Sequence, residues 1–241
     1  MRALRHFRKG LILSYLPVYA GELIIIFLGI TLSWWFEEWR QDKQERQRES
    51  LHLSNLRSNL ETDSATISIE LSDMKESLRR LKALEKAIDT GTTDSLGHYV
   101  RSMILVAEFH PNDSEFEVIK STGEIGLILD DTLRRDIMTL YEVVYGQIAF
   151  RIELNHQAVI INNWDYAVKN FDLSKVIRAG HESEMKFNLK SDEGKMVLKN
   201  KVGLSMLILN VTIKRFEEGI RKIGEVRSRI SGRLTAISTD L

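Results

Sequence analysis

The sequence predicts an all-α protein in which a single N-terminal transmembrane helix continues into an antiparallel bundle of long helices with coiled-coil-like packing. Three observations lead to this class. A basic segment precedes an almost uncharged apolar run, apolar residues after position 50 recur at steps of three and four, and no useful stretch alternates between apolar and polar residues. The 241 residues are 43% hydrophobic and 28% charged, with no cysteine. This composition excludes disorder, a disulfide scaffold and thiol catalysis.

Residues 1–19 are predicted to form a basic amphipathic segment at the membrane interface. The segment carries four basic side chains and no acid, and its apolar residues fall on another side of the helical wheel. We expect Pro17 to interrupt this helix, because proline removes a backbone donor and clashes with the preceding turn. The basic side chains are Arg2, Arg5, Arg8 and Lys9.

Residues 20–39 are the predicted transmembrane helix. From Glu22 to Trp39 it would rise about 27 Å, close to the hydrocarbon thickness of a bilayer. The positive-inside rule then places the N-terminus in the cytoplasm and the C-terminal domain in the periplasm. A signal peptide cleaved after Ala20 and a buried soluble helix are the alternatives. Aromatic rings gather at the far end, as expected for the headgroup region: Trp34, Trp35, Phe36 and Trp39.

Several features of this helix indicate partners. Gly29 and Ser33 form a small-xxx-small pair, which lets another membrane helix approach closely. We expect Glu22 to lie at the cytoplasmic interface, within reach of water. The tryptophan cluster could contact a lipid or a pigment as well as a protein. Membrane lipids and other membrane protein subunits are therefore the expected partners, while the net charge of zero argues against nucleic acid.

Residues 40–241 are predicted to form an extracytoplasmic α-helical bundle, with long helices at about 40–90, 131–171 and 193–233. The first continues the membrane helix almost without a break from Glu22 to Ile88. Its apolar stripe has coiled-coil spacing, with Leu84 offset from it. The stripe contains Leu56, Leu60, Ile67, Leu71, Met74, Leu78, Leu81 and Ile88.

Shorter elements are expected between the long helices. The sequence predicts a helix over 95–108 and a second one that begins at a Ser114–Glu117 capping box and ends at Gly123. Asp130 or Asp131 caps the next long helix, and residues 172–192 form a flexible connection. The buried candidates of the last helix are Val197, Leu204, Leu207, Val211 and Ile220.

Two stretches resemble an uncharacterised family of bacterial single-pass membrane proteins. They are the run GELIIIFLGITLSWWFEEWRQDKQER and the run NDSEFEVIKSTGEIGLILDDTLRRDIMTLYE. The first departs from the family at Leu32–Phe36, where the family more often has polar residues. The resemblance implies a bacterial inner-membrane protein with a helical outer domain, and it implies no activity. The second run matches a family signature at Ile119, Ser121, Gly123, Ile125 and Ile128.

Motifs for chemistry are almost absent, so we expect no enzymatic activity and no cofactor. The sequence contains no phosphate-binding glycine loop, nucleophile elbow or His-Glu-x-x-His motif. Two Glu-x-x-His pairs, Glu49/His52 and Glu153/His156, leave a weak di-iron hypothesis, because such pairs ligate iron in four-helix bundles. Solvated helical side chains are the favoured interpretation, since the last helix offers no evident pair of partner glutamates.

The last helix is locally basic, which suits either a solvated face or a docking surface for an acidic partner or lipid headgroups. Its seven basic residues are Lys214, Arg215, Arg221, Lys222, Arg227, Arg229 and Arg233.

These features predict a non-catalytic, membrane-anchored accessory or structural subunit that binds and stabilises a larger membrane protein complex. Respiratory and photosynthetic assemblies are candidates by type. The expected contacts are the Gly29/Ser33 face, the tryptophan cluster and the coiled-coil stripe. The alternatives are a periplasmic ligand-binding or signalling module that acts through a separate partner, and a di-iron carboxylate enzyme. The cytoplasmic side is expected to hold no output domain.

Overall fold

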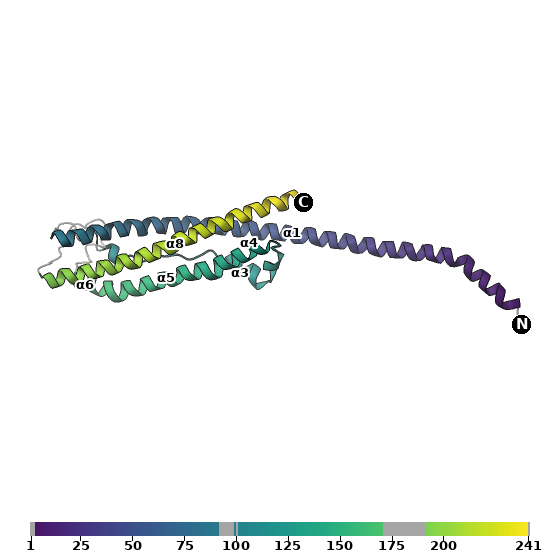
Figure 1. Ribbon diagram of the computed structural model, residues 1–241, viewed down its shortest axis with the longest axis horizontal. Helices are drawn as coiled ribbons and strands as arrows, with labels where there is room; N and C mark the ends of the chain where they lie inside the picture. The colour runs from purple at the N-terminus through teal and green to yellow at the C-terminus, as the bar shows by residue number, and fades with distance from the viewer. Residues whose placement is uncertain (1–2, 92–98, 100, 171–190, 241) are drawn as a thin grey trace.

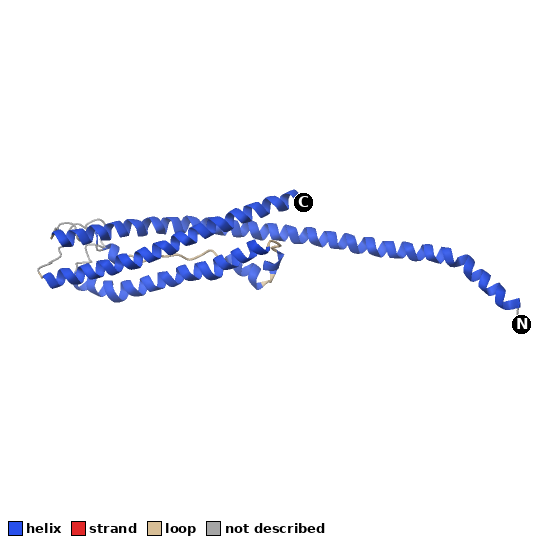
Figure 2. Ribbon diagram, viewed as in Figure 1, coloured by secondary structure: helices blue, strands red, loops and turns tan. Residues whose placement is uncertain are grey.

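The computed structural model describes residues 3–91, 99, 101–170 and 191–240, and the side chains from Gly21 to Thr239 among them. None of these residues lies in a strand (Figure 2), which confirms the all-α prediction. The elements are α1 (Ala3–Thr90), η1 (Arg101–Met103), α3 (Ser114–Ser121), η2 (Glu124–Leu127), α4 (Asp131–Met138), η3 (Thr139–Val144), α5 (Tyr145–Ala158), η4 (Val159–Trp164), α6 (Asp165–Asn170) and α8 (Asp192–Asp240). The π-helical turns η3 and η4 join α4, α5 and α6 without a break.

Helix α1 is one helix of 88 residues, about 130 Å long. The expected interruption at Pro17 is wrong, because α1 continues through this residue. A proline within a helix removes one hydrogen bond and bends the helix without ending it, and the ribbon of α1 bends near its N-terminal end (Figure 1). The predicted basic side chains fall outside the described side chains; they are Arg2, Arg5, Arg8 and Lys9. Most of the predicted connection over 172–192 also lies outside the described residues.

The C-terminal half of α1 packs with the other elements into an elongated helical body (Figure 1). We use this name for residues 45–90 of α1 together with α3 to α8. Helix α8 runs antiparallel to α1 along the length of the body, and the series from α4 to α6 packs beside both. The N-terminal half of α1 projects beyond the body.

The predicted apolar stripe of α1 lies in the core of this body. Seven of its eight members are buried, Leu78 is half-buried against the core, and Leu84 is buried with them. Leu81, Leu84 and Ile88 follow one another at steps of three and four, so the expected offset at Leu84 is wrong. Because the stripe packs inside the body, it is not available as the partner-binding surface that the sequence predicted.

Helix α8 buries a different set of residues from the predicted one. Val197, Leu204 and Leu207 are exposed, and Val211 and Ile220 are half-buried, with Ile220 against the core. The fully buried residues of α8 lie in a neighbouring register. This helix is apolar on more than one side, so periodicity alone selects the wrong face. The buried apolar residues of α8 are Leu198, Val202, Leu209, Ile213, Phe216, Ile223, Val226, Ile230 and Ile237.

The predicted helix over 95–108 does not reach its expected end: in its described part Tyr99 and η1 are helical, and residues 105–113 have no regular secondary structure. Backbone N–H groups of this segment, which would bond to carbonyl groups in a helix, donate instead to carboxylates of α1. Glu70 accepts from the backbone N–H of Glu108, and Asp63 accepts from that of Asn112. These tertiary hydrogen bonds hold the segment against α1.

The ends of the short helices follow the sequence only in part. Asp130 caps α4 as expected, accepting from the backbone N–H groups of Thr132 and Leu133, and Gly123 follows α3 with a left-handed φ of 77°. The capping box at Ser114 is wrong, because the Ser114 hydroxyl donates to Asn112 instead.

Among the described residues, one helix is long and apolar enough to cross a membrane by length and composition, namely Asp192–Thr239 within α8. No stretch among the described residues of α1 meets that test, although residues 23–36, between Glu22 and Glu37, carry no charge. A core helix can pass the same test, and α8 packs against both α1 and α5.

Candidate functional site

Residues 23–39 of α1 expose apolar side chains in every direction, and we call them the exposed N-terminal segment. Ile25 and Phe27 are 71% and 69% exposed, and Ile26 and Leu28 are exposed as well. An extended apolar surface of this kind marks contact with a membrane or another protein. Gly29 and Ser33 also lie here, and no atom lies within 4 Å of a side chain built at Gly29.

The predicted aromatic cluster forms the C-terminal end of this segment. Trp34, Trp35, Phe36 and Trp39 are all more than half exposed. The Phe36 and Trp39 rings lie 5.7 Å apart, and the Lys43 amine lies 5.7 Å from the Trp39 ring. Charged residues follow directly, so apolar surface gives way to polar surface within one turn.

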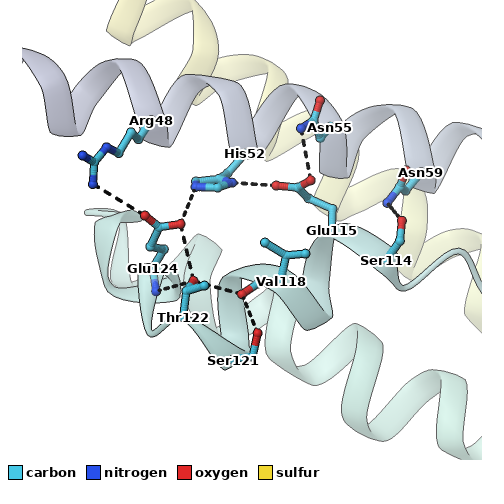
Figure 3. A network of polar contacts seen from close by, with 10 residues as sticks. All are labelled: Arg48, His52, Asn55, Asn59, Ser114, Glu115, Val118, Ser121, Thr122 and Glu124. Carbon is cyan, nitrogen blue, oxygen red and sulfur yellow. Dashed lines mark hydrogen bonds and ion pairs between the residues drawn. The ribbon is translucent and has the colours of Figure 1, made fainter.

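A polar junction joins α1 to α3 and η2 where α1 enters the body (Figure 3). Its centre is His52, whose Nδ1 lies 2.6 Å from a Glu115 oxygen and whose Nε2 lies 3.1 Å from a Glu124 oxygen. Carboxylate oxygens accept only, so both contacts are hydrogen bonds when both ring nitrogens carry protons. His52 therefore ties two separate elements to the helix that continues into the exposed N-terminal segment.

Neighbouring side chains of α1 extend this junction in both directions (Figure 3). Asn55 donates to the second Glu115 oxygen at 3.1 Å, and Asn59 donates to the Ser114 hydroxyl at 3.4 Å. On the other side, Arg48 lies 3.6 Å from Glu124. One face of α1 thus holds the start of α3 and Glu124 at the start of η2.

Glu49 forms a second contact at the same level, on another face of α1. Its side chain is 1% exposed and binds Arg233 of α8 through two hydrogen bonds of 2.8 Å. It also accepts from the backbone N–H of Leu129 at 3.3 Å. A bidentate carboxylate–guanidinium pair is both strong and specific in geometry, so it fixes the C-terminal part of α8 against α1.

Asp63 is a carboxylate inside the apolar stripe of α1, between Leu60 and Ile67. It is 2% exposed and accepts from the Tyr145 hydroxyl at 2.7 Å as well as from Asn112. Burial raises the pKa of Asp63, and its two hydrogen bonds oppose that change. Burial and the neighbouring Asp63 also raise the pKa of Tyr145 well above its usual value.

The two Glu-x-x-His pairs do not meet. Glu49 and His52 bind the partners described above, whereas Glu153 and His156 lie exposed on α5, where Glu153 accepts from Gln157. The residues that the structure describes contain no group of three or more His, Asp or Glu side chains arranged to hold a metal ion. The geometry required by the di-iron hypothesis is therefore absent from this part of the chain.

Most basic side chains of the last helix bind acids of the same chain. Lys222 and Arg229 both lie 3.0 Å from Asp136, and Arg227 lies 3.4 Å from Glu61. These ion pairs hold α8 to α4 and α1, so the face is mainly an internal contact of the body.

The clefts near these groups are small. One of 140 Å³ lies beside Glu49 and is lined by Asp42, Arg46 and Leu129 among others. Another, of 220 Å³, is lined by Asp73, Arg80 and Arg101 among others. Both are below the usual size of pockets for small molecules.

Comparisons with known proteins add no relative: no family model, no curated protein and no solved structure matches this chain.

Sequence reasoning missed Arg233, Glu115 and Glu124 as partners of Glu49 and His52. Each contact joins residues more than 60 positions apart, and no local spacing encodes such a pair. A signal existed for Asp63, because it occupies the stripe position that is missing between Leu60 and Ile67.

Substitution of His52 by alanine is expected to loosen the junction. The change leaves Glu115 and Glu124 without their shared partner and should cost about 2 kcal/mol of stability. Hydrogen exchange measured by mass spectrometry should show faster exchange in the peptide over 113–129. His156→Ala, on the exposed face of α5, is the matched control and should leave exchange unchanged. Equal exchange in both variants would contradict this role.

Replacing Asp63 by asparagine should flatten the pH dependence of stability. The raised pKa of Asp63 means that the folded chain binds the proton more readily than the unfolded chain. The contribution of this group to the free energy of unfolding therefore increases as the pH falls from 7 toward the ordinary value of 3.8. Urea unfolding of both proteins between pH 7 and 4 should show wild type gaining stability relative to Asp63→Asn, and a constant difference would rule this out.

Proposed function

We propose that this protein is a non-catalytic, membrane-anchored accessory subunit that binds and stabilises a larger membrane protein complex. The observation that carries the proposal is the exposed N-terminal segment. A continuous helix that is apolar on all sides and has no protein neighbour is stable in lipid and unfavourable in water.

The exposed N-terminal segment is a better anchor than α8, although only α8 meets the length and composition test. Helix α8 buries one face against α1 and α5 and holds ion pairs with both α1 and α4. Inserting it into a bilayer would dismantle the body. The uncharged residues 23–36 would rise about 21 Å, and the tryptophan cluster and Glu22 would extend this length into the interfaces.

The orientation follows from charge. Four basic residues precede the anchor, whereas the residues after Trp39 are mixed in sign. The positive-inside rule then places the N-terminus in the cytoplasm and the body, as an antiparallel bundle, on the outer side of a bacterial inner membrane.

Two features supply contacts for a partner in the membrane. Gly29 and Ser33 leave room for a close helix, and the four aromatic rings offer apolar area at the interface. The polar junction at His52 and the Glu49–Arg233 pair would hold the body in a fixed position relative to the anchor. A rigid link of this kind suits a structural subunit.

Purification in a mild detergent tests the proposal. The tagged full-length chain should bring down one set of membrane proteins in fixed stoichiometry, and Gly29→Leu should reduce their recovery severalfold. Gly21→Leu, at the edge of the same helix, is the control and should retain them. Recovery of the folded chain without other membrane subunits would contradict the proposal, and a small molecule that raises the Tm would favour the ligand-binding alternative.

A further inference from the structure

The outer side of the series from η3 to α6 carries an apolar stripe that the core does not use. Six large apolar side chains, here called the outer stripe, point away from the body. Ile161 is 72% exposed, and the others are between 37% and 59% exposed. The outer stripe consists of Val143, Phe150, Leu154, Ile161, Trp164 and Val168.

The spacing of the outer stripe is that of a helix–helix contact. Together with Gln147 and Gln157, its members occupy every position of a series with alternating steps of four and three from 143 to 168. Within the regular helix α5 this spacing is that of a coiled-coil seam, and the π-helical turns η3 and η4 at its ends shift the positions beyond α5 around the helix axis. The series extends for about 37 Å along the helix.

The charges around the outer stripe favour an uncharged partner. None of the eight seam positions is charged. The flanking charges already have partners within the chain, since Lys169 binds Asp165, Glu153 binds Gln157 and Arg151 lies over the Phe150 ring. An acidic or basic partner would thus find nothing to recognise here, whereas an identical stripe would be complementary.

A second copy meets this stripe in register. Two chains anchored in one membrane with the same orientation hold their bodies at the same height, and a two-fold axis along the body would face each seam residue with its own counterpart. Gln157 would then lie opposite its own counterpart, whereas the Gln147 oxygen accepts from Arg215 of α8 and lies toward the edge of the seam. A polar pair of this kind fixes the register, as buried polar residues do in coiled coils.

The available area is sufficient for such a pair. Six side chains about half exposed, at roughly 200 Å² for a large side chain, offer on the order of 600 Å² per chain, and the glutamines and flanking residues bring this near the 800 Å² of a standard interface. Confinement to one membrane raises the effective concentration further.

We infer that the outer stripe is the surface through which two copies of this chain pair in parallel in the membrane. The inference rests on the proposed anchor for its parallel register.

Cysteine cross-linking of the full-length chain in membranes tests this pairing. Because the natural chain has no cysteine, Gln157→Cys and His156→Cys each introduce one thiol, at neighbouring positions on and beside the seam. Mild oxidation should convert most of the Gln157→Cys protein into a disulfide-linked dimer and yield at least fivefold less from His156→Cys. Adding Ile161→Asp to Gln157→Cys should abolish the dimer, whereas adding Ala149→Asp should not.

The outcomes separate the two proposals. Membrane fractionation before oxidation reports on the anchor, and the ratio of cross-linked products reports on the outer stripe. A membrane-bound chain with no dimer, or with equal yields at positions 156 and 157, would overturn the pairing and leave the anchor intact. A cross-linked product that contains one copy and a different protein would also overturn it, in favour of a heterologous partner.

Discussion

Replacing both Ile26 and Ile30 by aspartate is expected to move the chain from the membrane fraction to the soluble fraction. Each aspartate near the centre of a membrane helix costs about 3 kcal/mol of insertion free energy. Two of them cost about 6 kcal/mol, which corresponds to a change of about 10⁴-fold in partitioning. Ile26 and Ile30 are 58% and 66% exposed and touch no part of the body, so the body should remain folded.

Ultracentrifugation of lysed cells followed by immunoblotting measures this partition. The matched control places two aspartates at exposed apolar positions of α1 within the body, Leu51 and Ile69. That variant should stay in the membrane fraction. If the Ile26/Ile30 variant also stayed there, the anchor would have to lie elsewhere, and α8 would become the candidate.

The second large effect is expected from Arg233→Ala. The substitution leaves the carboxylate of Glu49, which is 1% exposed, without its charged partner. Removing one member of a buried ion pair typically costs 3–5 kcal/mol, because the remaining charge stays desolvated. For a chain of this size the Tm should fall by about 10 °C, as measured by circular dichroism in detergent.

Two further variants separate the ion pair from general damage to α8. Arg229→Ala should cost less than about 1 kcal/mol, because Arg229 is half exposed and Asp136 keeps Lys222 as a partner. Replacing Glu49 and Arg233 together by leucine should restore most of the lost stability, since no unpaired charge remains. An Arg233→Ala protein as stable as Arg229→Ala would show that Glu49 is not held by this pair.

The heptad stripe of α1 was predictable because it is long and regular. Seven of its eight residues are buried, Leu78 is half-buried against the core, and the same spacing leaves a gap that Asp63 fills. The start of α4 at Asp130 and the end of α3 at Gly123 were also predictable, because caps and left-handed turns depend on local residue types.

The remainder depends on tertiary contacts that local patterns do not encode. Residues 105–113 form no helix, and Glu70 and Asp63 accept backbone hydrogen bonds from Glu108 and Asn112, which no local propensity reveals. The face of α8 was misassigned because apolar residues occur on more than one side of it. The partners of His52 and Glu49 lie far away in the sequence. The outer stripe was also not predicted, because the inner face of the same helical series already accounted for the apolar periodicity of its sequence.

Site-directed spin labelling tests the central claim, a membrane anchor at residues 20–39, most directly. The absence of cysteine allows single labels at Ile26→Cys, Ile30→Cys and Gln44→Cys in the full-length chain reconstituted into bilayers. We predict that labels at positions 26 and 30 collide readily with oxygen and are shielded from a water-soluble nickel complex, with the reverse at position 44. If all three labels were equally accessible to the nickel complex, residues 20–39 would lie in water and the account would be contradicted.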